Sequence, residues 1–285
     1  MTEQRAPPLI IDAKGRAHQI NLDVELHRAA LDRMRKGRDL KIIITAKNSQ
    51  TGVGKTTLAG WLALSWTRWL GGIPWYCNPD KPEDGMATLN PGEYFKIVKK
   101  VGNEFPAGTV VLVDDAEELD ARRSMQSLNV EFSQRWMLMR LKQAITIITL
   151  PSPSSIDSRL EELADYWINI ERRGRALVHN IEVQDYGARN VLTRQSHWVT
   201  YPDVSDHPEM QKLTEMKQDK MDDWDTQTED GPTPAEVEKE TKREHAQRLR
   251  DMGVPIEAQD PETPDIVSTI DMSQSWISKN TQASG

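Results

Sequence analysis

One short tract constrains the fold of this chain more than any other: residues 49–56, with the sequence SQTGVGKT. It follows an apolar run at residues 40–45 and precedes an apolar stretch at residues 57–70. This order predicts a buried strand, a glycine-containing loop and a helix. Backbone N–H groups of such a loop point inward, and together with the helix N-terminus they can surround a phosphate group. The tract therefore predicts a phosphate-binding loop.

Two side chains of the tract are expected to have specific roles. Lys55 would reach the β- and γ-phosphates of a nucleotide, and the Thr56 hydroxyl would hold Mg²⁺. The loop departs from the usual pattern at its first position, where Ser49 replaces a glycine that relaxes the backbone. The alternative is a turn that binds nothing, but the strand–loop–helix context favours a nucleotide. Further nucleotide contacts are expected from the rest of the loop and its flank: Ser49, Gln50, Thr51, Gly52, Val53, Gly54 and Thr57.

Charge is distributed unevenly along the chain. Of its 44 acidic and 36 basic residues, residues 201–285 carry 20 and 9, which leaves 24 and 27 in residues 1–200. The acidity therefore belongs to the C-terminal part, and the remainder is close to neutral. This overall charge does not indicate a nucleic-acid-binding protein.

Several compositional features bear on the cellular compartment. The single cysteine, Cys77, excludes an internal disulfide and suits a reducing cytosol. The six histidines show no zinc-ligand spacing. No apolar run approaches the roughly 20 residues that a membrane-spanning helix needs, and the first ten residues do not resemble a leader. We therefore expect a soluble, cytoplasmic protein without a membrane span.

Apolar segments alternate with helical patterns between residues 22 and 183. The alternation predicts a three-layer α/β fold, with helices on both faces of a mostly parallel central sheet. The helix after the loop contains three tryptophans, which we assign to the core rather than to base stacking. The expected helices are 22–36, 55–70, 91–100, 130–142 and 155–164. The expected strands are 40–45, 73–77, 109–113, 144–150, 166–170 and 176–178, with an extension of the last to residue 183 left open.

Four regions are expected along the chain. Residues 1–37 form an N-terminal arm and helix, of which the first twenty residues are a loose arm. Residues 38–202 form the nucleotide-binding domain. Residues 203–233 are acidic and polar and read as a flexible linker. Residues 234–285 form a small helical module.

A pair of acidic residues supplies a second candidate part of the site. Asp114 and Asp115 end the apolar run at residues 109–113. Ligands of parallel sheets bind beyond the carboxyl ends of the strands, where this pair and the loop would meet. We assign Mg²⁺ binding to Asp114 and activation of the attacking water to Asp115, with Glu117 or Glu118 as its replacement. The alternative is that Asp115 caps the following helix.

The two motifs, with an additional strand at residues 144–150, resemble the additional-strand branch of the P-loop NTPases, which includes FtsK–HerA-like ATPases. The resemblance covers residues 40–183. In that group an aspartate and a second acidic residue, usually glutamate, end the third strand, and a polar residue ends the fourth. Asp114, Asp115 and Thr149 match these positions. The resemblance thus implies ATP and Mg²⁺ as cofactors and Thr149 as a sensor of the γ-phosphate.

The same resemblance implies a homo-oligomer, often a ring, in which an arginine from one subunit completes the site of its neighbour. We favour Arg140 and Arg159 because they flank the strand that carries Thr149. The full set of candidates is Arg122, Arg123, Arg135, Arg140, Arg159, Arg172 and Arg173.

The segment at residues 266–279 resembles a helix-turn-helix, with a turn at Asp271 and Met272 and a second helix capped by Ser273. Residues of that second helix are expected to contact DNA: Gln274, Ser275, Ser278 and Lys279. The alternative is an amphipathic helix pair for self-assembly.

These patterns together predict an Mg²⁺-dependent ATPase that acts on DNA in translocation, genome packaging or mobile-element maintenance. The alternative is a slow ATP-dependent switch that loads or regulates other proteins on DNA. A small-molecule kinase is disfavoured because no lid-like arginine cluster is present. The absence of an Asn-Lys-x-Asp guanine motif favours ATP over GTP.

Overall fold

The computed structural model describes residues 9–11, 17–19, 21, 24–47, 52–116, 132, 134–137, 139–152, 158–183, 191–230, 242–243, 246–247, 249–251 and 255. The chain divides into two compact units, Met1–Gln218 and Asp219–Gly285. The sheet and the candidate site both belong to the first unit.

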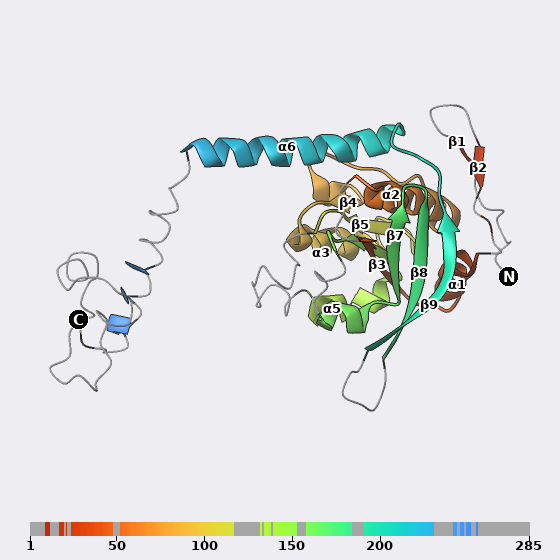
Figure 1. Ribbon diagram of the computed structural model, residues 1–285, viewed down its shortest axis with the longest axis horizontal. Helices are drawn as coiled ribbons and strands as arrows, with labels where there is room; N and C mark the ends of the chain where they lie inside the picture. The colour runs from red at the N-terminus through yellow and green to blue at the C-terminus, as the bar shows by residue number, and fades with distance from the viewer. Residues whose placement is uncertain are drawn as a thin grey trace. The chain divides into compact units, whose positions relative to one another are not determined.

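The first unit is an α/β fold around a mostly parallel sheet (Figure 1). The described strands of this sheet lie in the order β4-β5-β6-β3-β7-β8-β9. The neighbours from β4 to β7 are parallel, and β8 and β9 add an antiparallel edge. The strands are β3 (Leu40–Ala46), β4 (Ala87–Thr88), β5 (Val110–Val113), β6 (Ile145–Thr149), β7 (Tyr166–Arg172), β8 (Arg175–Val183) and β9 (Val191–Thr200).

The helices that pack on this sheet begin with α1 (Glu25–Arg35) and α2 (Lys55–Trp66), which continues as one π-helical turn, Thr67–Gly71. They continue with α3 (Pro91–Lys100) and α5 (Ser158–Leu163). Short 3-10 turns occur at Pro82–Asp84 and at Met139–Lys142. The last helix of the first unit, α6 (Pro208–Asp230), runs on into the second unit. None of the described helices is both long enough and apolar enough to cross a membrane.

The core explains why the central strands were predictable. Every residue of β3, β5 and β6 is buried, because strands inside a parallel sheet are covered on both faces and therefore read as continuous apolar runs. Helix α2 is buried almost all round, and Trp61 and Trp66 belong to the core as expected. Trp66 donates a hydrogen bond from Nε1 to Nδ1 of buried His27, at 3.1 Å.

Three predicted loops or strands are corrected by the structure. Residues 73–77 are not a strand. Trp75 is buried, and its Nε1 donates a hydrogen bond to the carbonyl of Val110 at 3.1 Å, so it contacts the sheet through its side chain. The edge position is taken by the two-residue strand β4, which lies between the expected strand 73–77 and the expected helix 91–100, where no strand was predicted. Within the predicted loose arm, β1 (Leu9–Ile11) and β2 (Ala17–Gln19) form an antiparallel pair.

Strand β9 was missed because it is an edge strand with mostly intermediate or exposed side chains. It pairs with β8 along its whole length, from Val191 opposite Val183 to Thr200 opposite Arg175. The extension of β8 to Val183, left open above, is confirmed. Residues 132 and 134–137 are helical and are followed by the 3-10 turn, which shortens the helix expected to continue through residue 142.

The prediction of a flexible linker over residues 203–233 is wrong for Pro208–Asp230, which form α6. The segment was predicted as a linker because its composition is acidic and polar. It nevertheless contains a short apolar stripe, in which Met210, Leu213 and Met216 are buried at helical spacing. In the expected C-terminal module, residues 242–243, 246–247 and 249–251 are helical. The segment at residues 266–279, with Gln274, Ser275, Ser278 and Lys279, lies outside the described residues.

Candidate active site

The site begins where the loop enters α2. Gly52 and Gly54 have φ of 71° and 100°, a left-handed backbone that glycine adopts readily. Gly54 forms the N-cap of α2, and a Cβ atom there would lie 2.8 Å from the Tyr201 hydroxyl. Lys55, Thr56 and Thr57 follow in the first turn, whose N–H groups have no partners within the helix. Ser49, Gln50 and Thr51 lie outside the described residues.

The end of β5 and the start of α2 meet at one buried carboxylate. Asp114 has an exposed fraction of 0%. The Thr56 hydroxyl contacts both of its oxygens, at 2.9 Å (Oδ2) and 3.2 Å (Oδ1). The Thr149 hydroxyl, at the end of β6, donates to Oδ1 at 2.6 Å. The structure therefore brings together three residues that the sequence assigned to one site from three separate elements.

Thr149 also fixes the second acid. Its hydroxyl oxygen accepts a hydrogen bond from the backbone N–H of Asp115 at 2.8 Å, and its carbonyl accepts one from Ala116 at 3.0 Å. Asp115 has a φ of 46°, a left-handed conformation that aspartate tolerates better than most residues. Thr149 itself is fully buried and does not line the pocket described below. It therefore positions the two aspartates, while its role as a γ-phosphate sensor stays a prediction.

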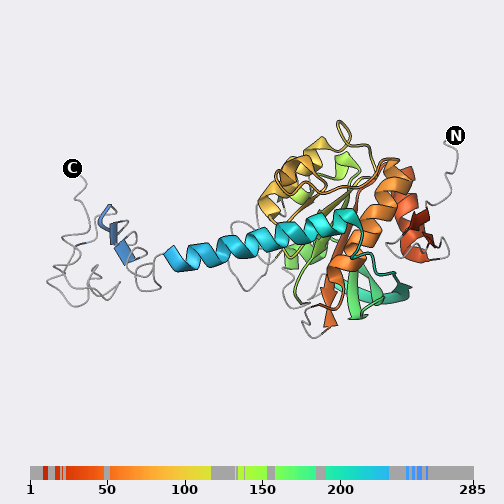
Figure 2. The ribbon, with the colours of Figure 1, turned by 90° about the horizontal axis from the view of Figure 1, so that it is seen from above.

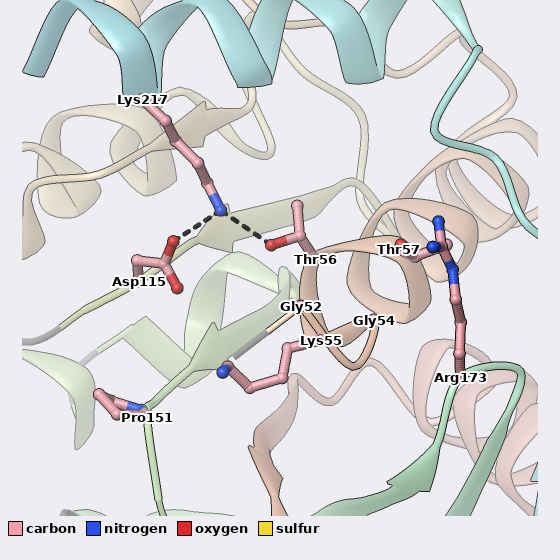
Figure 3. Close-up of a pocket in the computed structure, with 9 residues that line it drawn as sticks. All are labelled: Gly52, Gly54, Lys55, Thr56, Thr57, Asp115, Pro151, Arg173 and Lys217. Carbon is pink, nitrogen blue, oxygen red and sulfur yellow. Dashed lines mark hydrogen bonds and ion pairs between the residues drawn. The ribbon is translucent and has the colours of Figure 1, made fainter. Parts of the chain in front are cut away.

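A lysine that the sequence did not single out completes this cluster. Lys217, on α6, places Nζ 2.9 Å from the Thr56 hydroxyl, 2.7 Å from Asp114 Oδ2 and 2.6 Å from Asp115 Oδ2. Figure 3 shows its side chain reaching from α6 toward Thr56 and Asp115. Its side chain keeps only 27% of its exposure, and that of Asp115 keeps 45%.

The charges of this cluster stabilise one another. Burial disfavours the charged form of Asp114, but the ammonium group of Lys217 and the hydrogen bonds from Lys217, Thr149 and Thr56 outweigh it and lower the pKa of that carboxyl. Burial likewise opposes the charge of Lys217, and the two carboxylates outweigh it and raise the pKa of that amine. Asp114 is therefore an ionised carboxylate, and Lys217 a cation, at neutral pH.

Of this cluster, Thr56, Asp115 and Lys217 line a pocket of about 500 Å³, a volume within the usual range for small-molecule sites. Lys55 enters it from the N-terminus of α2 and Lys217 from α6 (Figure 3). A third cation, Arg173, lies on the turn between β7 and β8 and also pairs with Asp203 at 2.9 Å. The lining consists of Gly52, Gly54, Lys55, Thr56, Thr57, Asp115, Pro151, Arg173 and Lys217. Three cations around one cavity suit a polyphosphate.

The favoured arginines lie elsewhere or cannot be placed. Arg140 is exposed in the 3-10 turn before β6, at the amino end of that strand, whereas Thr149 marks the carboxyl end beside the pocket. The side chain of Arg159 lies outside the described residues, as do Arg122 and Arg123. Among the candidate arginines of the described part of the chain, Arg173 is the one that lines the pocket.

The donor set of the cluster fits Mg²⁺. This ion prefers oxygen ligands and usually takes only one or two carboxylates, leaving the other positions to water and substrate phosphates. Thr56 and Asp114 supply one hydroxyl and one carboxylate beside the pocket. Among the described residues there is no group of three or more His, Cys, Asp or Glu side chains that could form an all-protein metal site. Because Lys217 contacts the same oxygens, the ion fits only after that side chain moves.

The comparisons with known proteins give structural likenesses only. No protein-family model and no curated protein matches this chain. The N-terminal domain of zonular occludens toxin from Neisseria meningitidis is 18% identical, with a TM-score of 0.35 over 59% of this chain and 97% of that one. The genome packaging NTPase B204 from Sulfolobus turreted icosahedral virus 2 is 9% identical, with a TM-score of 0.34 over 55% and 98%. EssC (ATPases 2 and 3) from Geobacillus thermodenitrificans is 14% identical, with a TM-score of 0.33 over 68% and 45%. At these identities and TM-scores, the likenesses carry no information on the function of this chain.

Proposed function

We propose that the chain is a P-loop NTPase that binds ATP with Mg²⁺ and hydrolyses it to ADP and phosphate. The observation that carries this proposal is the contact of Thr56 with buried Asp114, at 2.9 Å, beside the first turn of α2. The two residues come from motifs 58 positions apart, and a hydroxyl paired with a carboxylate next to a phosphate-binding loop is the protein part of an Mg²⁺–nucleotide site.

The strand order supports the additional-strand branch. Strand β6 lies between β3, which leads into the loop, and β5, which carries the aspartates. Its last residue, Thr149, therefore lies beside Asp114 and can hold both acids in place. An aspartate directly after a strand, without this additional strand, would have no such support.

Each residue of the site has a role that its position allows. The amides of the first turn of α2 and the Lys55 ammonium bind phosphate oxygens. Thr56 and Asp114 would hold Mg²⁺, which when bound neutralises charge on the phosphates. Asp115, which lines the pocket, accepts a proton from a water molecule that attacks the terminal phosphate. Arg173 lies at the pocket wall, where its charge favours a polyanion.

We further propose that this ATPase acts on DNA, as the sequence resemblance and the helix-turn-helix-like segment suggest. A slow ATP-dependent switch is the second candidate, and one observation favours it: Lys217 contacts both aspartates and Thr56, so a side chain of the same chain occupies the ligands assigned to Mg²⁺. The short reach of Asp115, in place of the usual glutamate, also suits slow turnover.

Steady-state release of phosphate from ATP, with and without duplex DNA, separates the two candidates. A motor should show turnover that DNA raises and that Lys55→Ala abolishes. A switch should show nucleotide-dependent affinity for DNA with little turnover in either condition. Nucleotide binding that is equal in wild type and Lys55→Ala would contradict both candidates. Lys96→Ala is the control, because Lys96 is exposed on α3 and is not part of the pocket lining.

A further inference from the structure

The side chain of Lys217 contacts residues that are far from it in the sequence. Its Nζ atom contacts three oxygens that belong to two elements distant in sequence, Thr56 on α2 and the aspartate pair after β5. A lysine ammonium is a compact charge with three donors, so three oxygens satisfy it completely. Two of these oxygens are the ones assigned above to Mg²⁺.

The helix that carries Lys217 is held in place by specific contacts. Met210, Leu213 and Met216 of α6 are buried within the first unit. Met210 packs against α2 at Gly60, where a Cβ atom would lie 2.1 Å from the methionine Sδ. Figure 2 shows the first part of α6 passing α2. Lys217 follows Met210 by seven residues, about two helical turns, and therefore projects from the same face of α6.

A polar contact fixes the start of the same helix. Glu209 accepts a hydrogen bond from the backbone N–H of Cys77 at 2.7 Å and pairs with Lys212 at 2.9 Å. The segment Pro208–Gln218 is therefore anchored at its beginning by Glu209, along one face by the apolar stripe and at its end by Lys217. Releasing Lys217 from the aspartates removes the contact at the end of this segment and leaves the other two in place.

Lys217 and Mg²⁺ cannot bind these oxygens together. Mg²⁺ binds its ligands at about 2.0–2.1 Å, so an ion on Thr56 and Asp114 would lie at the position of the ammonium or directly against it. Two cations at that separation repel strongly in a site with little water. Departure of Lys217 alone would leave the buried Asp114 carboxylate without a compensating charge, which is costly. The arrangement therefore favours exchange of one cation for the other.

We propose that Lys217 is a built-in competitor of Mg²⁺, and that binding of Mg²⁺ with nucleotide expels it and loosens the segment Pro208–Gln218. This inference rests on the proposed function, because it assumes that the pocket takes Mg²⁺ and a nucleotide. It adds regulation of that site: Lys217 occupies the ligands assigned to Mg²⁺ until the metal–nucleotide complex displaces it, and the same step loosens the part of α6 that belongs to the first unit.

The test is the Mg²⁺ dependence of binding of a fluorescent non-hydrolysable ATP analogue to the full chain. Lys217→Met keeps the aliphatic stem of the side chain and removes the charge. Lys212→Ala is the matched control, since it removes a lysine from the same helix that pairs only with Glu209 in the described structure. We expect the Mg²⁺ concentration at half-saturation to fall about tenfold or more in Lys217→Met and to stay at the wild-type value in Lys212→Ala.

Hydrogen exchange of the backbone amides at residues 211–217 gives a second readout that does not depend on catalysis. In wild type, Mg²⁺ with the analogue should speed their exchange, and the analogue without Mg²⁺ should not. Equal Mg²⁺ dependence in wild type and Lys217→Met, or slower exchange at these amides on binding, would overturn the inference while leaving the proposed function intact. Failure of wild type and Lys217→Met alike to bind the analogue would overturn both the inference and the proposed function.

Discussion

Replacing Thr149 by valine tests whether the two acids are held by one hydroxyl. Valine keeps the shape of threonine and removes two hydrogen bonds, one donated to Asp114 at 2.6 Å and one accepted from the Asp115 N–H at 2.8 Å. A hydrogen bond to a charged group contributes about 1.5–3 kcal/mol, and leaving an N–H without a partner costs about 1 kcal/mol or more. Because Asp114 keeps Thr56 and Lys217, we expect Thr149→Val to lower the free energy of unfolding by about 3 kcal/mol.

The assay is urea unfolding of the full chain followed by tryptophan fluorescence, with Thr149→Ser as the control. Serine keeps the hydroxyl and removes one methyl group from a buried position, which costs about 1 kcal/mol. Valine should therefore be the more destabilising replacement, by about 2 kcal/mol, although it preserves the volume of the side chain. A Thr149→Val protein as stable as Thr149→Ser would refute the positioning role given to this hydroxyl.

Two further predictions concern the loop and the core. Gly54→Ala should weaken binding of an ATP analogue about tenfold or more. An alanine at φ 100° is strained, and its Cβ atom would lie 2.8 Å from the Tyr201 hydroxyl. Unchanged affinity of this variant in calorimetry would contradict the prediction. Burial lowers the pKa of His27 from 6.5 to about 4, so the neutral ring stabilises the fold fully above pH 6.5 and this stabilisation is lost as the pH falls through 4. The loss should reach about 3 kcal/mol in urea unfolding, and His27→Gln should remove that part of the pH dependence; an unchanged pH profile would show that another group is responsible.

The central part of the fold was readable from the sequence because burial on both faces leaves a strong pattern. Strands β3, β5 and β6 are fully buried, and each appears as a continuous apolar run that ends in a loop or a polar residue. The meeting of Thr56 with Asp114 followed from the rule that carboxyl ends of parallel strands share one edge, and the structure places them 2.9 Å apart.

Strand β9 and helix α6 were missed because their described side chains are mostly exposed or half-buried. Their composition is therefore polar, and among the described side chains of α6 the buried apolar stripe consists of Met210, Leu213 and Met216. The prediction of a strand at residues 73–77 was wrong for the opposite reason. These residues are apolar and include buried Trp75, but their backbone forms no strand of the sheet.

Lys217 could not be identified as a site residue from the sequence, for a different physical reason. Its partner Thr56 is 161 positions away, and no local pattern distinguishes this lysine from the others in an acidic, polar segment. The packing of α6 on the first unit, which includes the contact of Met210 with Gly60 and that of Glu209 with Cys77, brings it to the aspartates. Its contact with the candidate metal ligands is therefore a property of the tertiary structure alone.

Whether this pocket binds a nucleotide can be measured by calorimetry with a non-hydrolysable ATP analogue in the presence of Mg²⁺. We expect wild type to bind one nucleotide per chain, and Lys55→Ala and Asp114→Ala to lose this binding. Lys96→Ala should bind as wild type does. Absence of binding by wild type across millimolar Mg²⁺, together with absence of binding by Lys217→Met, would contradict the assignment of this pocket to a nucleotide.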